Sequence, residues 1–373
     1  MSQRLRGLVA AGQSVWLDYI DRRMLLDGSL QRLIADDGLR GMTSNPTIFE
    51  KALAEGNAYD EQIASAPAGA TPWELFELVE TDDVRRACDL FASVYAESLG
   101  SDGYVSIEVS PSVANDSAGT IAEARRLWAT VDRPNVMVKV PGTVEGATAV
   151  RRLIADGINV NITLLFAIAA HDRVIESYLA GLEDRASAGL AINRIASVAS
   201  FFVSRVDSEV DKRLDALANA DPDATRMKGQ AAVANAKLAY RRFVQRFSGD
   251  RWERLRALGA RVQRPLWAST STKNPAYRDV LYVEALIGPD TVNTMPPATV
   301  DAFRDHGIVA RTVDEGWEAA DALFVALAAK GIGLDQVTDK LLTEGLASFQ
   351  KSFDGLLAGL EHRVASLSTG RVA

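Results

Sequence analysis

The stretch NVMVKVPGT, residues 135–143, decides the fold of this chain. Its apolar, β-prone run carries one charge, Lys139, and ends at a proline–glycine pair before Thr143, which can cap a helix. A strand this apolar is typical of a parallel sheet with helices outside. A buried ammonium is costly, whereas a neutral amine is a nucleophile toward carbonyls. Lys139 could instead reach water or pair with a carboxylate. The residues on the other strands must therefore show whether Lys139 is a nucleophile or only a structural charge.

The whole chain alternates β-like runs with helical stretches. Repeated β–α units predict a parallel sheet, and eight of them suit a closed (β/α)8 TIM barrel, whose sites lie at the carboxyl ends of the strands. We expect one domain, 1–373, with additional helices that include a C-terminal amphipathic helix over 334–366. A doubly wound sheet is the alternative, but no Gly-x-Gly-x-x-Gly follows the first candidate strand. The candidate strands are 15–18, 41–45, 104–109, 136–140, 158–163, 195–202, 266–269 and 291–295.

Composition narrows the class of protein. The 373 residues are 47% hydrophobic and 24% charged, as in globular proteins, and the net charge of −8 disfavours nucleic acid or anionic membrane as a partner. Cys88 is the only cysteine and there are three histidines, so we expect no intramolecular disulfide and no cysteine cluster that binds zinc or an iron–sulfur centre. No apolar run has signal-peptide or transmembrane length, which favours a cytoplasmic protein. A monomer and a homodimer both remain open.

Polar side chains recur at the ends of the candidate strands. In 104–109, Ser106 and Glu108 share one face, so alternation points both into the barrel. A lysine, carboxylates and amides that converge at one barrel mouth are typical of an active site. The same residues could instead have purely structural roles: helix caps at Asp18 and Asn45, an ion pair between Glu108 and Lys139, and a hydrogen-bond network in 159–163. The candidates from the other strands are Asp18, Asn45, Asn161, Thr163, Ser200 and Ser269.

Two segments after late strands are candidates for binding an anion. SFFVSR, residues 200–205, supplies a serine and Arg205, and STSTKNP, residues 269–275, supplies hydroxyls and Lys273. Such groups can hold a phosphate, and barrels often bind phosphate near their late strands. Alternatively, Arg205 pairs on the surface with Asp207 or Glu209, and Lys273 is a solvated loop charge.

The motifs together resemble the transaldolase family. The resemblance extends from about residue 15 to residue 313, and the turn WASTSTKNP, residues 267–275, is similar to the longer bacterial branch of the family. In shorter relatives an arginine of this turn helps to hold the phosphate, and Lys273 or Ser269 would take that place here. The matching segments are TSNPTIF (43–49), VSIEV (105–109), VMVKVPGT (136–143), NVNITLLF (159–166) and SFFVSR (200–205).

The resemblance implies a Schiff-base mechanism in the pentose phosphate pathway. A dihydroxyacetone unit would pass from sedoheptulose 7-phosphate to glyceraldehyde 3-phosphate, which gives erythrose 4-phosphate and fructose 6-phosphate. By motif match, Lys139 attacks the ketose carbonyl, Asp18 takes the C4-hydroxyl proton, and Glu108 moves protons through a water held by Thr163. An iminium is itself an electron sink, so the reaction needs no metal or cofactor.

The remaining matches concern binding. Asn45 and Asn161 would hold the hydroxyls of the three-carbon unit with help from Ser200, Arg205 would bind the phosphate, and Phe202 matches an aromatic near the catalytic water. Two other functions compete with this one. They are an aldolase similar to fructose 6-phosphate aldolase, which releases free dihydroxyacetone, and a non-catalytic sugar-phosphate-binding barrel. The C-terminal helix could cover the site or simply pack on the barrel.

Overall fold

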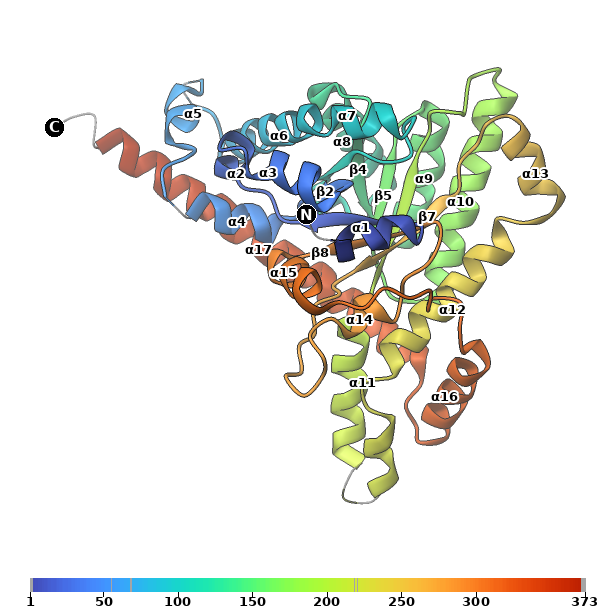
Figure 1. Cartoon of the computed structure of the whole chain (residues 1–373). Coiled ribbons are helices and arrows are strands. Elements are labelled where there is room, and N and C mark those ends of the chain that lie inside the picture. The colour runs from blue at the N-terminus through green and yellow to red at the C-terminus, as the bar shows by residue number, and fades with distance from the viewer. Residues whose placement is uncertain (1–2, 55, 68, 218, 220, 370–373) are drawn as a thin grey trace.

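Eight parallel strands close into a barrel in sequence order, β1 to β8, which confirms the predicted (β/α)8 class (Figure 1). The computed structural model describes residues 3–54, 56–67, 69–217, 219 and 221–369. Each strand pairs with its neighbours in the chain, and β8 closes the barrel by pairing with β1. The strands are β1 Gln13–Asp18, β2 Gly41–Thr43, β3 Tyr104–Glu108, β4 Val136–Pro141, β5 Val160–Leu165, β6 Ser197–Phe202, β7 Gln263–Ala268 and β8 Thr291–Met295.

Strand register brings the polar residues of neighbouring strands level with one another. Glu108 of β3 lies beside Lys139 of β4, which in turn lies beside Asn161 of β5. Paired residues of a parallel sheet point to the same face, so these three side chains all enter the barrel. The predicted inward direction of Ser106 is also confirmed, because its hydroxyl accepts a hydrogen bond from Asn161.

Every strand except β8 differs from the prediction at one or both of its ends, and the differences in β7 and β5 have a physical reason. β7 begins at Gln263 rather than Leu266, because Pro265, normally a strand breaker, is accommodated where β7 pairs with β6. Pairing with β8 begins only at Leu266. β5 continues to Leu165, and its register shifts after Ile162. Leu164, with φ of 59°, causes this bulge, and an apolar sequence gives no sign of a left-handed residue there.

Helices surround the barrel between successive strands, and local capping starts several of them. The side chain of Thr143 accepts a hydrogen bond from the Gly146 amide and caps α9, as predicted. The helices are α1 Gln3–Ala10, α2 Arg22–Leu26, α3 Ser29–Arg32, α4 Pro46–Ala54, α5 Asp60–Ser65, α6 Pro72–Leu90, α7 Ala92–Glu97, α8 Ser117–Val131, α9 Val144–Asp156, α10 Ile168–Ser187, α11 Ser204–Leu217, α12 Ala231–Arg246, α13 Gly249–Ala257, α14 Leu281–Glu284, α15 Pro297–His306, α16 Trp317–Ala329 and α17 Leu334–Thr369.

The long C-terminal helix α17 crosses the molecule diagonally and lies beside α4 (Figure 1). It also contacts α6, α11 and β5, so it spans elements from opposite sides of the barrel. A side chain at Gly345 would approach Leu164 to 3.1 Å, which shows how closely α17 rests on the end of β5. The predicted helix is therefore present and covers the barrel mouth. Among the described residues, no helix combines the length and apolar character needed to cross a membrane.

Candidate active site

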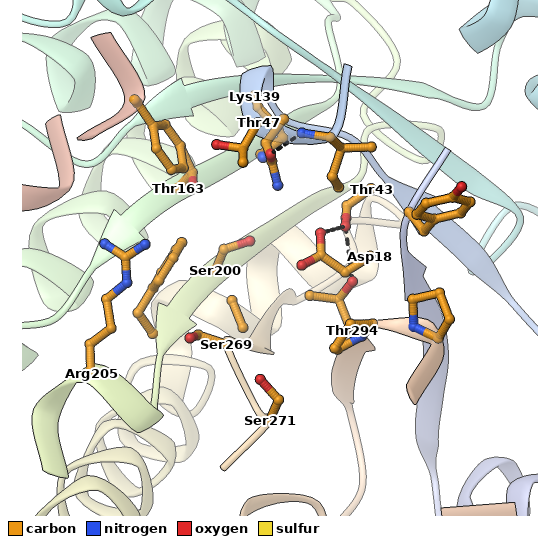
Figure 2. A pocket seen from close by; sticks show the side chains of 18 of the residues that line it. Asp18, Thr43, Thr47, Lys139, Thr163, Ser200, Arg205, Ser269, Ser271 and Thr294 are labelled. Carbon is orange, nitrogen blue, oxygen red and sulfur yellow. Dashed lines mark hydrogen bonds between the residues drawn. The ribbon is translucent and has the colours of Figure 1, made fainter. Parts of the chain in front are cut away.

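A cavity of about 460 Å³ opens at the carboxyl ends of the strands, where the sequence predicted the site (Figure 2). Residues from seven strands or the loops that follow them contribute to its wall. Lys139, Asp18 and Arg205, which lie far apart in the chain, all line it. The other lining residues are Tyr19, Thr43, Asn45, Thr47, Ile48, Lys51, Thr163, Ser200, Phe202, Ala268, Ser269, Ser271, Lys273, Thr294, Pro296, Pro297 and Phe349.

Lys139 forms a buried pair with Glu108. The lysine Nζ donates to Glu108 Oε2 and to the carbonyl of Ser44, both at 2.8 Å. Both charged side chains are less than 10% exposed. Burial raises the pKa of Glu108, although the nearby Lys139 charge lowers it. The predicted ion pair thus exists, and a carboxylate with a raised pKa is also a suitable acceptor for the proton of this lysine.

A second carboxylate, Asp18, lies at the end of β1. Its Oδ1 accepts a 2.9 Å hydrogen bond from Thr43, whose hydroxyl is also 2.9 Å from that of Thr294. Burial raises the pKa of Asp18, while the charge of Lys139, the Thr43 hydrogen bond and the charge of Lys273 lower it. The helix-cap alternative receives no support, because Asp21 rather than Asp18 caps α2. Figure 2 shows the Asp18 carboxylate beside Thr43 and Thr294 at the cavity wall.

A hydrogen-bonded chain runs beneath the cavity. Asn161 is fully buried, donates to the Ser106 hydroxyl at 3.0 Å and accepts from the Ser200 hydroxyl at 2.7 Å. The expected polar network is therefore present. Thr163 is not part of this network, because its buried hydroxyl has no hydrogen-bond partner among the described residues. A buried hydroxyl left in this state is suited to hold a water or a substrate atom.

The cavity wall near β2 is built by α4 and α17. Asn45 caps α4, because its side-chain oxygen accepts from the amide of Ile48 at 3.0 Å, as the cap alternative predicted. The residue lines the cavity as well, and an amide nitrogen at this position can donate to a ligand. Thr47 donates to Ser352 of α17 at 2.8 Å, and Phe349 of α17 reaches the cavity.

Arg205 and Lys273 bring two cations to the opposite wall. Arg205 lies over the ring of Phe202, with the guanidinium carbon 5.6 Å from the ring centre. The surface pairs considered for it do not form, because Asp207 bonds to Ala232 and Tyr282 whereas Glu209 bonds to Arg213 and Lys340. Partial burial lowers the pKa of Arg205. Such a cation is well suited to pair with an anion.

Lys273 stays accessible to solvent and donates to Ser271 at 2.8 Å. Desolvation and the Arg205 charge lower the pKa of Lys273, so the two cations are close enough to repel each other. Ser269, also predicted for the site, has a left-handed backbone with φ of 56° and its hydroxyl lies 3.0 Å from that of Ser204. Two neighbouring cations with a hydroxyl-rich turn can together bind an anion, and this side of the cavity is called the anion-binding wall below.

Several lining residues were absent from the sequence prediction. Thr43 and Thr294 share a face with other inward residues, so strand alternation could have identified them. Phe349 had no such signal, because it comes from a helix far along the chain. Among the described residues, no group of histidine, cysteine, aspartate and glutamate could hold a metal ion. The donors of the cavity suit a polar, anionic organic ligand.

The chain is similar to known proteins over nearly its whole length. The family model described as Transaldolase/Fructose-6-phosphate aldolase matches residues 15–360. A protein named transaldolase from Mycobacterium leprae is 48% identical over 367 residues, which cover 98% of this chain and 97% of the relative. A transaldolase from Trichodesmium erythraeum is 46% identical over 366 residues, or 96% of each chain, and transaldolase 1 of Streptomyces coelicolor is 48% identical over 358 residues, or 95% and 93%. The chain therefore belongs to the transaldolase/fructose-6-phosphate aldolase family.

Proposed function

We infer that this protein is a transaldolase that transfers a dihydroxyacetone unit through a Schiff base on Lys139. The observation that carries this proposal is the amine of Lys139, which lines the cavity 2.8 Å from Glu108. The family and its near full-length relatives named transaldolase support the same activity. The donor would be sedoheptulose 7-phosphate or fructose 6-phosphate, and the acceptor glyceraldehyde 3-phosphate or erythrose 4-phosphate.

The first step is the formation of the iminium. Glu108 takes a proton from Lys139, and the resulting amine attacks the ketose carbonyl to give a carbinolamine. Glu108 then returns a proton to the departing hydroxyl, through a water that Thr163 holds with its unpartnered hydroxyl. Water leaves and the iminium remains. The raised pKa of Glu108 suits both directions of this proton transfer.

Carbon–carbon cleavage then depends on Asp18. Its carboxylate takes the C4-hydroxyl proton, the bond between C3 and C4 breaks, and the iminium receives the electron pair as an enamine. The raised pKa of Asp18 makes it a better base than an exposed aspartate, and Thr43 fixes its orientation. The aldehyde leaves, a second aldehyde enters, and the same steps run in reverse.

The binding residues keep the three-carbon unit and the phosphate apart. Asn45, Asn161 and Ser200 hold the hydroxyls of the bound unit, while Arg205 takes the phosphate with Lys273 and Ser269. Phe202 presents a ring that can neither donate nor accept a proton, which favours transfer over hydrolysis of the intermediate. Phe349 adds a second apolar surface from α17. A single domain, a cytoplasmic location and a monomeric or dimeric state stay predictions.

Borohydride reduction in the presence of fructose 6-phosphate tests the proposal. Reduction should fix the dihydroxyacetone unit on Lys139, as peptide mass spectrometry would show, and Lys139→Arg should give no adduct. The variant should also lose turnover while it keeps the wild-type circular dichroism spectrum. A wild-type enzyme without an adduct would support the non-catalytic sugar-phosphate-binding alternative, in which Lys139 only balances the charge of Glu108.

A further inference from the structure

We propose that Tyr277 and Tyr282 are positioning residues that hold Lys273 at the phosphate-binding wall. The inference rests on the proposed function and adds the residues that set the geometry of its anion-binding pair. Arg205 is fixed by the first turn of α11, whereas Lys273 belongs to the 269–280 connection between β7 and α14. If Arg205 and Lys273 are to bind the same phosphate, other residues must hold the 269–280 loop in a fixed position relative to α11.

The first anchor is Tyr277, four residues after Lys273. Its hydroxyl donates to Asp211 Oδ2 at 2.5 Å, and the other oxygen of Asp211 accepts from the amide of Gly229 at 3.0 Å. Gly229 has φ of 72°, and a Cβ there would lie 2.8 Å from the Tyr277 ring. The ring therefore packs closely on the backbone, so both halves of the tyrosine are fixed.

The second anchor is Tyr282, whose partner lies one helical turn earlier on α11. Its hydroxyl donates to Asp207 Oδ2 at 2.8 Å, and Asp207 Oδ1 accepts from the amide of Ala232 at 2.7 Å. Tyr282 and Asp207 are each about 1% exposed, so water does not compete with this bond. Asp211 thus joins the Lys273 loop to α11, the helix that carries Arg205. Asp207 joins α11 to α14, which directly follows that loop, and also bonds to the start of α12.

The same bonds also keep Lys273 on the substrate side. A second cavity of about 320 Å³ lies beside the first, and Lys273 lines both. Asp207, Asp211 and both tyrosines line this second cavity. Each tyrosine hydroxyl engages a carboxylate oxygen that could otherwise attract the lysine. Removal of a hydroxyl would loosen the loop and also offer Lys273 a competing carboxylate away from Arg205.

The test is a steady-state comparison of wild type, Tyr277→Phe and Tyr282→Phe. We expect KM for fructose 6-phosphate to rise about tenfold in each variant, because a loosened contact weakens phosphate binding, while kcat changes less than twofold. The inhibition constant of inorganic phosphate should rise by the same factor. Borohydride trapping of dihydroxyacetone, which has no phosphate, should be unchanged. Tyr178→Phe is the matched control, because its hydroxyl bonds to the carbonyl of Arg261 away from the site.

The outcomes separate the two proposals. If wild type traps no dihydroxyacetone, the Schiff-base function is wrong. If trapping is normal and KM for the Tyr277→Phe variant stays within twofold of wild type, the positioning role alone is wrong. A fall in kcat with unchanged KM would likewise refute it, because that pattern indicates a smaller folded fraction. Tyr277 is partly exposed, so its variant remains informative even if Tyr282→Phe fails to fold.

Discussion

Replacement of Glu108 by glutamine separates a catalytic ion pair from a structural one. Glutamine keeps the size of the side chain and an oxygen that can accept from Lys139 Nζ, which lies 2.8 Å from the native carboxylate. It cannot take or return a proton. General acid–base catalysis by one positioned group contributes about 10²–10⁴-fold, so kcat should fall by that factor, equivalent to roughly 3–5 kcal/mol of barrier.

The assay is rapid-quench borohydride trapping with fructose 6-phosphate, alongside steady-state turnover. The rate of adduct formation on Lys139 should fall with kcat, because Glu108 serves the steps that form the iminium. Glu123→Gln is the matched control, since that carboxylate also has a raised pKa but bonds to the Ser110 amide. If Glu108→Gln traps and turns over within threefold of wild type, the carboxylate is only a countercharge and the proposed proton transfer through Glu108 is wrong.

Three further predictions follow from the site and its support. Arg205→Ala should raise KM for fructose 6-phosphate by about 10–100-fold, which is the effect of one lost hydrogen bond to a charged group. The control is Arg213→Ala, which loses the ion pair with Glu209 and should leave KM unchanged. Fructose 6-phosphate alone should release at most one equivalent of glyceraldehyde 3-phosphate per site and no free dihydroxyacetone; continued release of dihydroxyacetone without an aldehyde acceptor would indicate an aldolase. Burial raises the pKa of Asp207 to about 6. At pH 5.0 the folded protein therefore holds a proton on Asp207 that the unfolded chain has released, and this stabilises the folded state. As the pH rises from 5.0 to 7.5, wild type should lose about 1.4 kcal/mol of unfolding free energy relative to Asp207→Asn. Calorimetry at both pH values checks this, and parallel profiles would contradict it.

Much of the barrel could be predicted because hydrophobic pattern and strand position act locally. β8, Thr291–Met295, was predicted to the residue, and the inward direction of Glu108 followed from alternation alone. The approach of Lys139 to Glu108 also followed, since neighbouring parallel strands end at the same side of a barrel. Local pattern could not reveal Phe349 or the Tyr277–Asp211 bond, because these depend on how helices and loops pack over the barrel.

Two of the places where local rules failed lie next to the cavity, and this has a physical reason. Leu164 and Ser269 directly follow inward-facing or lining residues of β5 and β7, and both have the left-handed backbone that non-glycine residues avoid. Such a conformation costs on the order of 1–3 kcal/mol and persists only where surrounding packing enforces it. At β5 the bulge ends the regular alternation immediately after Thr163, the residue whose hydroxyl remains unpartnered. At β7 the turn starts the loop that carries Lys273. The strain therefore coincides with the proposed water site and the proposed phosphate site, as expected where function rather than stability selects the local conformation.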